Sequence, residues 1–390
     1  MKRTTRNHFF MPSRLFFSII LATALSAISF AQGADAAADS AAEHQSRLQK
    51  FMDKVDKALT VSLYVDAYYA FYTDSLGPGD YQKFPSVSPR SNQFGLNVAH
   101  LMFHYETDKA RAHFALHYGD IQRSAWAGNV MEAQVGVRLC KKLWVDAGMF
   151  RTHVGAEGLM PKENLASSIA IPTYFEPYFQ AGVRLNYNPH EKVALYLFAL
   201  NGYNIYEDNN SKKSFGALVT YALSDKGNIG YSNYIGDDTP KHADSVSHCK
   251  VYQNVFFNYQ VKKLKIQVGT DVAVQKNSDI SEPDKSAVMF SGLASLKYGA
   301  CSKFFIYARG EFFQDPQGFM SGVMTDKTGK STGLKIYGAT LGVEYDPTDN
   351  TYVRLEGRQL MADKDQEIFY WDEEYRAWRF ETMLHMGVSF

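Results

Sequence analysis

From residue 60 to the C-terminus, hydrophobic and polar positions alternate along the chain with a period of two. In TVSLYVDAYYAFY (60–72), Val61, Leu63 and Val65 begin an apolar face, and polar residues fill much of the other. The final stretch, RFETMLHMGVSF (379–390), follows the same pattern and ends on an aromatic residue. A period of two indicates β-strands that have two different faces.

Sixteen segments of this kind follow one another, and their connections alternate in length. The segments lie near 60–72, 94–106, 110–119, 130–139, 142–151, 178–188, 192–203, 213–224, 227–236, 248–262, 263–276, 286–299, 302–314, 334–346, 350–362 and 377–390. Turns of a few residues alternate with long polar loops at 73–93, 120–129, 152–177, 204–212, 237–247, 277–285, 315–333 and 363–376. This alternation predicts an all-β fold, a transmembrane antiparallel up-and-down β-barrel of about 16 strands over 60–390.

Charged residues on the polar face favour a membrane barrel over a soluble β-domain. They occur at mid-strand positions: Arg184, Asp271, Arg309, Glu311, Arg354, Glu356, Arg358, Arg379 and Glu381. Each would cost roughly 2–4 kcal/mol on a lipid-facing surface near the midplane, but little in a water-filled lumen. No linker interrupts 60–390, although a set of smaller soluble β-domains would need one. The apolar stripe is therefore expected to face lipid, and the final strand to close the barrel against the first.

The N-terminus has the organisation of a secretory signal peptide. Basic residues precede an apolar run at 15–30: Lys2, Arg3, Arg6 and Arg14. The run has sixteen residues, about four fewer than a comfortable bilayer span. Small residues at Ser29 and Ala31 predict cleavage after Ala31, giving a signal peptide at 1–31. The alternative is an uncleaved membrane anchor.

A periplasmic extension at 32–59 is expected to contain one short amphipathic helix. Apolar residues recur at spacings of three and four within 40–59: Leu48, Phe51, Met52, Val55 and Leu59. The helix could pack in a pore mouth or against a neighbouring subunit. The alternative is a loosely held N-terminal extension.

Composition excludes some classes of partner and adds no cofactor. The formal net charge is zero, which argues against nucleic acid as a partner. Cys140, Cys249 and Cys301 form no metal-binding spacing and cannot all pair with one another. They are interpreted as incidental, with one disulfide as the alternative in an oxidising compartment.

Several stretches resemble the OmpL-like β-barrel porin family of bacterial outer membranes. They are VSLYVDAYYAFY, LNVAHLMFHYET, KKLWVDAGMFRTHVGAEG, PYFQAGVRLNYNP, LYLFALNGYN and FFIYARGEFFQDPQG. The resemblance covers nearly all of 60–390 and implies a passive pore in a Gram-negative outer membrane, without naming a substrate. By the same kind of resemblance, Phe390 looks like the recognition signal of the outer-membrane assembly machinery, and a homotrimer is expected by analogy.

The longest loop, 152–177, has room to fold into the lumen, as the third loop does in general porins. Gly155 and Gly158 permit a bend. The candidate pore constriction combines loop and wall residues: Glu157, Lys162, Glu163, Glu176, Arg184, Arg309, Glu311, Arg354, Glu356, Arg358, Arg379 and Glu381. Charges facing each other across the pore would orient passing polar solutes. The alternative is that these charges pair across strands and stiffen the wall. Their balanced signs predict weak ion selectivity.

Four histidines form a second, weaker candidate site. The alternation places His100, His104, His113 and His117 on the lumen side of two strands joined by a short turn, within about 5–8 Å of each other. Zinc or copper could bridge two of them, or their protonation could change the local charge. The alternative is ordinary polar lining, and we expect no metal site here.

These observations favour a channel for passive diffusion of small hydrophilic solutes or ions, narrowed by loop 152–177. The alternative is a surface receptor or adhesin that uses the external loops 315–333 and 363–376. A barrel enzyme would need a serine, a histidine and an acid together. His385 lies in the last strand without an evident serine at the same depth, and no nucleophile motif is present. We therefore expect no enzymatic activity.

Overall fold

The computed structural model describes residues 58–74, 80–84, 87–125, 128–241 and 246–390. The predicted signal peptide, 1–31, lies outside the described residues. So does the predicted helix at 40–59, apart from its last two residues, and the second of these, Leu59, begins the first strand.

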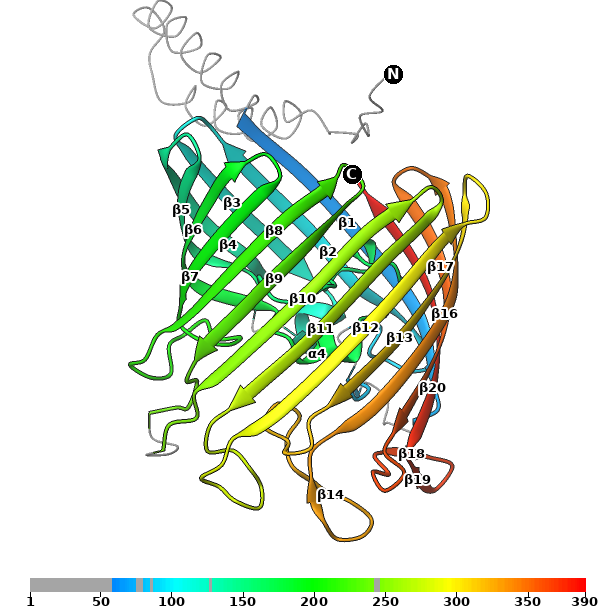
Figure 1. Ribbon diagram of the computed structural model, residues 1–390. Helices are drawn as coiled ribbons and strands as arrows, with labels where there is room; N and C mark the ends of the chain where they lie inside the picture. The colour runs from blue at the N-terminus through cyan, green and yellow to red at the C-terminus, as the bar shows by residue number, and fades with distance from the viewer. Residues whose placement is uncertain (1–57, 75–79, 85–86, 126–127, 242–245) are drawn as a thin grey trace, which may run out of the picture.

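Sixteen strands form one closed barrel in which each strand pairs antiparallel with its neighbours (Figure 1). They are β1 (Leu59–Tyr72), β2 (Gln93–Glu106), β3 (Ala110–Tyr118), β4 (Val130–Cys140), β5 (Leu143–Arg151), β6 (Phe179–His190), β7 (Val193–Leu200), β8 (Ser214–Ser224), β9 (Gly227–Gly236), β10 (Lys250–Val261), β11 (Leu264–Gln275), β12 (Ala287–Gly299), β13 (Phe304–Gln314), β16 (Lys335–Thr348), β17 (Thr351–Ala362) and β20 (Trp378–Ser389). The predicted fold and strand number are confirmed.

The last strand closes the barrel against the first. Tyr68 of β1 stands opposite His385 of β20 in this antiparallel pair. The terminal residue takes part, because the Phe390 amide donates to the Leu63 carbonyl oxygen at 2.8 Å, and the Leu63 amide donates back at 3.3 Å. Pairing of β1 with β20 leaves no free edge in the barrel sheet. A sheet in hydrocarbon must be closed in this way, because lipid offers no hydrogen-bond partner to an unpaired peptide group.

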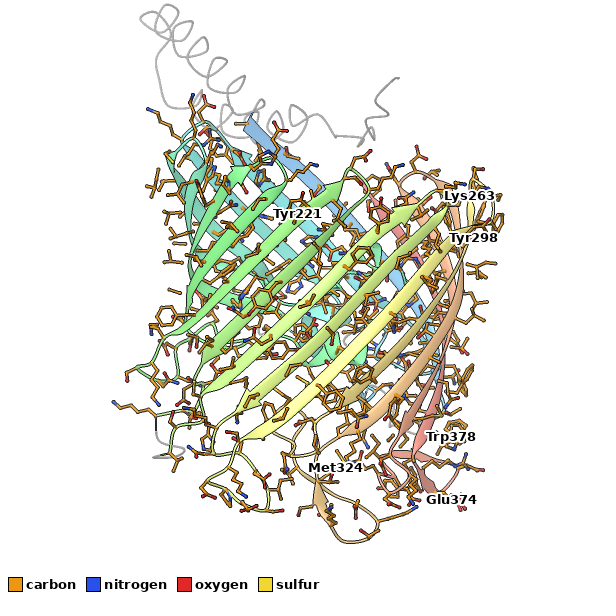
Figure 2. The ribbon with its side chains drawn as sticks, in the orientation of Figure 1. Tyr221, Lys263, Tyr298, Met324, Glu374 and Trp378 are labelled. Atoms are coloured by element: carbon orange, nitrogen blue, oxygen red, sulfur yellow. The ribbon has the colours of Figure 1, made fainter. Side chains whose placement is uncertain are left out.

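The two faces of the strands differ as the alternation predicts. In β17, Leu355 is 50% exposed on the outside of the barrel, whereas Arg354 beside it is 3% exposed on the inside. Figure 2 places Tyr221 and Tyr298 toward the end with the short turns, and Trp378 toward the end with the long loops. Aromatic residues near both rims of an apolar outer band are typical of membrane barrels. No helix among the described residues has the length and apolar character needed to cross a bilayer.

Several loops that the sequence analysis left irregular contain regular structure. Two small hairpins extend from the long-loop end: β14 (Met324–Thr325) pairs with β15 (Ser331–Thr332), and β18 (Phe369–Trp371) pairs with β19 (Glu374–Arg376). Short helices lie in two other loops: α3 (Asp120–Ala125), the 3-10 helix η1 (Pro161–Glu163) and α4 (Ile171–Phe175).

The three cysteines are free in the folded barrel. Cys140 and Cys301 are exposed, and Cys249 is half-buried. The disulfide kept as an alternative above is therefore absent from this structure.

Candidate functional site: the lumen beside loop 152–177

Loop 152–177 joins β5 to β6, and it contacts the far side of the barrel from within. The Ser167 amide donates to Glu356 Oε2 at 2.8 Å, and the Ile171 amide donates to Glu311 Oε2 at 2.5 Å. Both acids point to the inside of the barrel, so the loop lies in the lumen. Figure 1 shows α4, near the end of this loop, behind the strands of the front wall.

Two wall arginines hold the loop by charge-assisted hydrogen bonds. Arg309 of β13 donates to the Ser168 carbonyl oxygen at 2.5 Å and to Glu157 Oε1 at 3.2 Å. Arg354 of β17 donates to the Pro161 carbonyl oxygen at 2.7 Å. Such bonds are roughly twice as strong as neutral ones. The four inward side chains that hold the loop are called the docking wall: Arg309, Glu311, Arg354 and Glu356.

Further ion pairs connect the docking wall to the seam of the barrel. Arg358 of β17 lies 2.8 Å from Glu311 of β13 and 3.5 Å from Glu381 of β20. These two ion pairs connect the three strands. Arg379 pairs with Glu381 at 2.5 Å and with Asp74 at 3.4 Å. Wall charges therefore pair across strands as well as holding the loop. The predicted residues Arg379 and Glu381 belong to the seam and not to the set that contacts loop 152–177.

The charges carried by the loop itself have different surroundings. Glu163 forms a bidentate pair with Arg151 at 2.6 and 2.5 Å. Burial pushes the pKa of Glu163 upward, but the Arg151 guanidinium outweighs it and holds that pKa below its ordinary value. The Lys162 ammonium lies 4.4 Å from the centre of the Tyr64 ring, and burial lowers its pKa. Glu176 takes part in no ion pair within the described part of the chain.

A cavity of about 370 Å³ remains between the loop and the opposite side of the barrel. We call it the loop cavity. The predicted residue Arg184 of β6 lines it, and its Nε donates to Asp146 at 3.0 Å. The charged residues that line the loop cavity are Glu132, Arg151, Glu157, Glu176 and Arg184, and apolar residues from β8 and β10 are Leu218 and Phe256. The loop therefore narrows the lumen without filling it.

The four histidines are neighbours in the sheet, in the register that the short turn predicts. His100 stands opposite His117, and His104 stands opposite His113, with ring centroids 5.7 Å apart in the second pair. Within the described residues, no group of three or more histidine, cysteine, aspartate or glutamate side chains is placed to hold a metal ion. The two histidine pairs thus lie side by side on the barrel wall, and metal binding by them stays a weak prediction.

His385 has a serine partner, which corrects the expectation from sequence. Ser88 Oγ lies 3.0 Å from His385 Nε2, and His385 Nδ1 lies 3.2 Å from Asp66 Oδ1. Asn97 also contacts this network, since its Nδ2 donates to Asp66 Oδ1 at 2.6 Å. The side chains of Ser88, His385 and Asp66 are fully buried. The Ser88 hydroxyl is therefore closed off from the lumen in this structure, and the network ties an inward loop to β1, β2 and β20.

Sequence reasoning missed several residues that hold the loop or line the loop cavity. Arg151, the last residue of β5, anchors the loop through Glu163, and Glu132 and Asp146 complete the charges on β4 and β5. Gln267 of β11 donates to the Ala156 carbonyl oxygen at 2.7 Å. Glu132, Asp146 and Gln267 occupy inward positions of their strands, so the period-two rule could have included them.

Comparisons with known proteins agree with this architecture. A family model described as "Putative beta-barrel porin-2, OmpL-like" matches residues 58–390. A search of curated protein sequences finds no match.

Solved structures share the fold at low sequence identity. OprB of Pseudomonas putida has a TM-score of 0.57 at 11% identity, covering 88% of this chain and 96% of its own. The outer membrane channel DcaP of Acinetobacter baumannii has a TM-score of 0.56 at 10% identity, covering 85% and 97%. An anion-selective porin from Comamonas acidovorans has a TM-score of 0.55 at 11% identity, covering 85% and 99%.

Proposed function

Because the chain belongs to the beta-barrel porin-2, OmpL-like family, we propose that it forms a water-filled channel in the bacterial outer membrane. Small hydrophilic solutes or ions would cross it by passive diffusion. Loop 152–177 narrows the passage, and the candidate constriction comprises this loop together with the charged wall.

The observation that carries this proposal is the docked position of loop 152–177. Its contacts with the docking wall hold it to one side of the lumen, and the loop cavity remains on the other. A barrel of sixteen strands encloses an aqueous channel unless an inserted segment narrows it. Solutes passing the loop would therefore meet the charges of the loop cavity in preference to the docking wall, whose charges are already paired.

Single-channel conductance of the folded protein in a planar bilayer tests the proposal. We expect steady open steps from the unaltered chain, and larger steps after deletion of 155–170, because the deletion removes the segment that occupies the lumen. Deletion of 326–330, the tip of the β14–β15 hairpin, is the matched control and should leave the step size unchanged. A folded, heat-modifiable barrel without conductance would contradict the channel, and equal steps from both deletions would contradict the constriction.

Catalysis is not part of the proposed function. Burial of Ser88, His385 and Asp66 supports this, because a substrate would have to displace packed protein to reach the Ser88 hydroxyl. A fluorophosphonate probe that labels Ser88 in the folded protein would contradict it.

The receptor alternative rests on the external hairpins. Tyr370 and Tyr375 of the β18–β19 hairpin pack with ring centroids 5.0 Å apart, and Tyr375 is 63% exposed. Removal of this hairpin should leave conductance unchanged. Loss of binding to a cell surface or ligand after the same removal would favour the receptor.

Three further expectations concern assembly and export. We propose a homotrimer, which the mass of the detergent-solubilised protein would test. Recognition by the assembly machinery through Phe390 is tested by deleting that residue and measuring the amount of barrel in the membrane. Cleavage after Ala31 is tested by N-terminal sequencing of the mature protein.

A further inference from the structure

The loop cavity has an unequal set of charges on its lining. Three carboxylates, those of Glu132, Glu157 and Glu176, face two guanidiniums, those of Arg151 and Arg184. Both guanidiniums are also engaged by other acids behind the lining, Glu163 and Asp146. An ion crossing the loop cavity therefore meets an excess of negative charge when all carboxylates are ionised.

Two of the three carboxylates on this lining lie near a basic side chain and accept a backbone hydrogen bond. Glu157 lies 3.2 Å from Arg309 Nη1 and accepts a hydrogen bond from the Ala170 amide at 2.8 Å. Glu132 lies 4.0 Å from His113 and accepts from the Arg151 amide at 3.4 Å. These neighbouring groups partly offset the negative charges of Glu157 and Glu132.

Glu176 differs from both, because its charged neighbours are acids and its hydrogen-bonding neighbour is the neutral Thr173 hydroxyl. The residue is 3% exposed, its carboxylate packs against Gly155, and no cation of the described chain pairs with it. The ionisable side chains that face it come from the loop, from β10, from β11 and from the segment after β7: Glu157, Tyr252, Asp271 and Tyr203. The Tyr252 side chain is itself buried, and its hydroxyl lies beside the Asp271 carboxylate.

We propose that Glu176 determines the ion selectivity of the channel and makes it depend on pH. This inference rests on the proposed channel function. As a carboxylate, Glu176 gives the loop cavity one more negative than positive charge and favours cations. As a carboxylic acid, it leaves the lining charges balanced and the selectivity weak.

The surroundings of Glu176 shift its ionisation toward higher pH. Burial raises the pKa of Glu176 well above its ordinary value, and the negative charges of Asp271 and Glu157 raise it further. The Thr173 hydroxyl, which favours the carboxylate, offsets only part of this rise in pKa. Ionisation is thus delayed to higher pH than for an exposed glutamate. The preference for cations should increase as pH rises.

Reversal potentials across a bilayer in a KCl gradient, measured from pH 5 to pH 9, test the inference. For the unaltered channel we expect the potassium-to-chloride permeability ratio to rise by roughly fivefold, the size expected for one unit charge about 8 Å from an ion path through water. In Glu176→Gln the ratio should stay near its low-pH value at every pH. Glu282→Gln, in an external loop outside the loop cavity, is the matched control and should behave like the unaltered channel.

The outcomes separate the inference from the channel function itself. A ratio that does not change with pH in the unaltered channel would overturn the role of Glu176, and this measurement does not depend on the variant folding. A pH-dependent ratio that survives in Glu176→Gln would overturn it as well. Absence of any conductance in the unaltered chain would overturn the proposed function, and the inference with it.

Discussion

The two sides of the lumen use charge in different ways. On the docking wall, Arg309 and Glu311 are almost fully buried, and their partners are the loop and one another. Across the lumen, Arg184 pairs with Asp146 and still lines the loop cavity. The comparison teaches that the inward direction of a charge on a barrel strand does not reveal its role. One set of charges anchors a loop, whereas the other lines the loop cavity.

The largest expected effect comes from breaking the docking wall. Arg309→Ala should lower the free energy of unfolding by about 3–5 kcal/mol, because it leaves the buried Glu157 carboxylate without its cation. It should also enlarge the conductance step, since the loop loses its central anchor. Urea unfolding in detergent, followed by electrophoretic mobility, measures the first effect, and bilayer recording measures the second.

The matched substitution on the other side is Arg184→Ala. Its cost should be about 1 kcal/mol or less, because the side chain is partly exposed and Asp146 keeps Arg111 at 2.6 Å. Equal losses of stability from the two substitutions would remove the distinction between the two sides.

Narrowing the loop cavity directly should reduce conductance. Leu218 lines the loop cavity from β8, so Leu218→Trp places a larger side chain on the solute path. Val219, its neighbour, is 41% exposed on the outside of the barrel, and Val219→Trp is the control. A smaller conductance step is expected for the first variant alone. The same step size in both would place the solute path elsewhere.

Acidification should weaken the contact between Arg151 and Glu163, which anchors loop 152–177 to β5. The pKa of Glu163 is held below its ordinary value by Arg151, so the stability of this pair is present above the ordinary value of about 4.3 and is lost as pH falls through the lower, folded value. Current noise in the open channel should therefore be greater near pH 3 than at pH 6. Glu163→Gln should already be noisy at pH 6, and a quiet variant would contradict this anchoring role.

The smallest effect is expected from zinc. His104 and His113 are adjacent, but a pair of imidazoles supplies two of the four ligands that zinc usually takes. Conductance should be unchanged by zinc at micromolar concentration. A block that a chelator reverses would instead assign a metal site to these histidines.

The strands and their two faces could be predicted from sequence because a membrane barrel repeats one rule along the whole chain. Inward positions such as Arg354 and outward positions such as Leu355 follow from counting by two. Partners of the inward charges could not be predicted. Contacts such as that of Ser168 with Arg309 depend on the path of a long loop, which no periodicity describes.

Two local features also escaped prediction, for different physical reasons. The β18–β19 hairpin turns at Asp372 and Glu373, which both have positive φ values, 54° and 66°. Hairpins of this kind are usually marked by glycine or asparagine, and that signal is missing here. Ser88 lies in a loop, so its position beside His385 is set by folding of the loop into the lumen and not by strand register.

The docked loop has a consequence for the order of assembly. Loop 152–177 follows the fifth strand, yet the docking wall lies on β13 and β17, and its contacts with the loop join residues 140 and 193 positions apart in the chain. Contacts of such long sequence separation form late, because the intervening chain must be ordered first. A barrel that still lacks its final strands therefore lacks most of the docking wall, and the loop reaches its docked position only when that wall is complete.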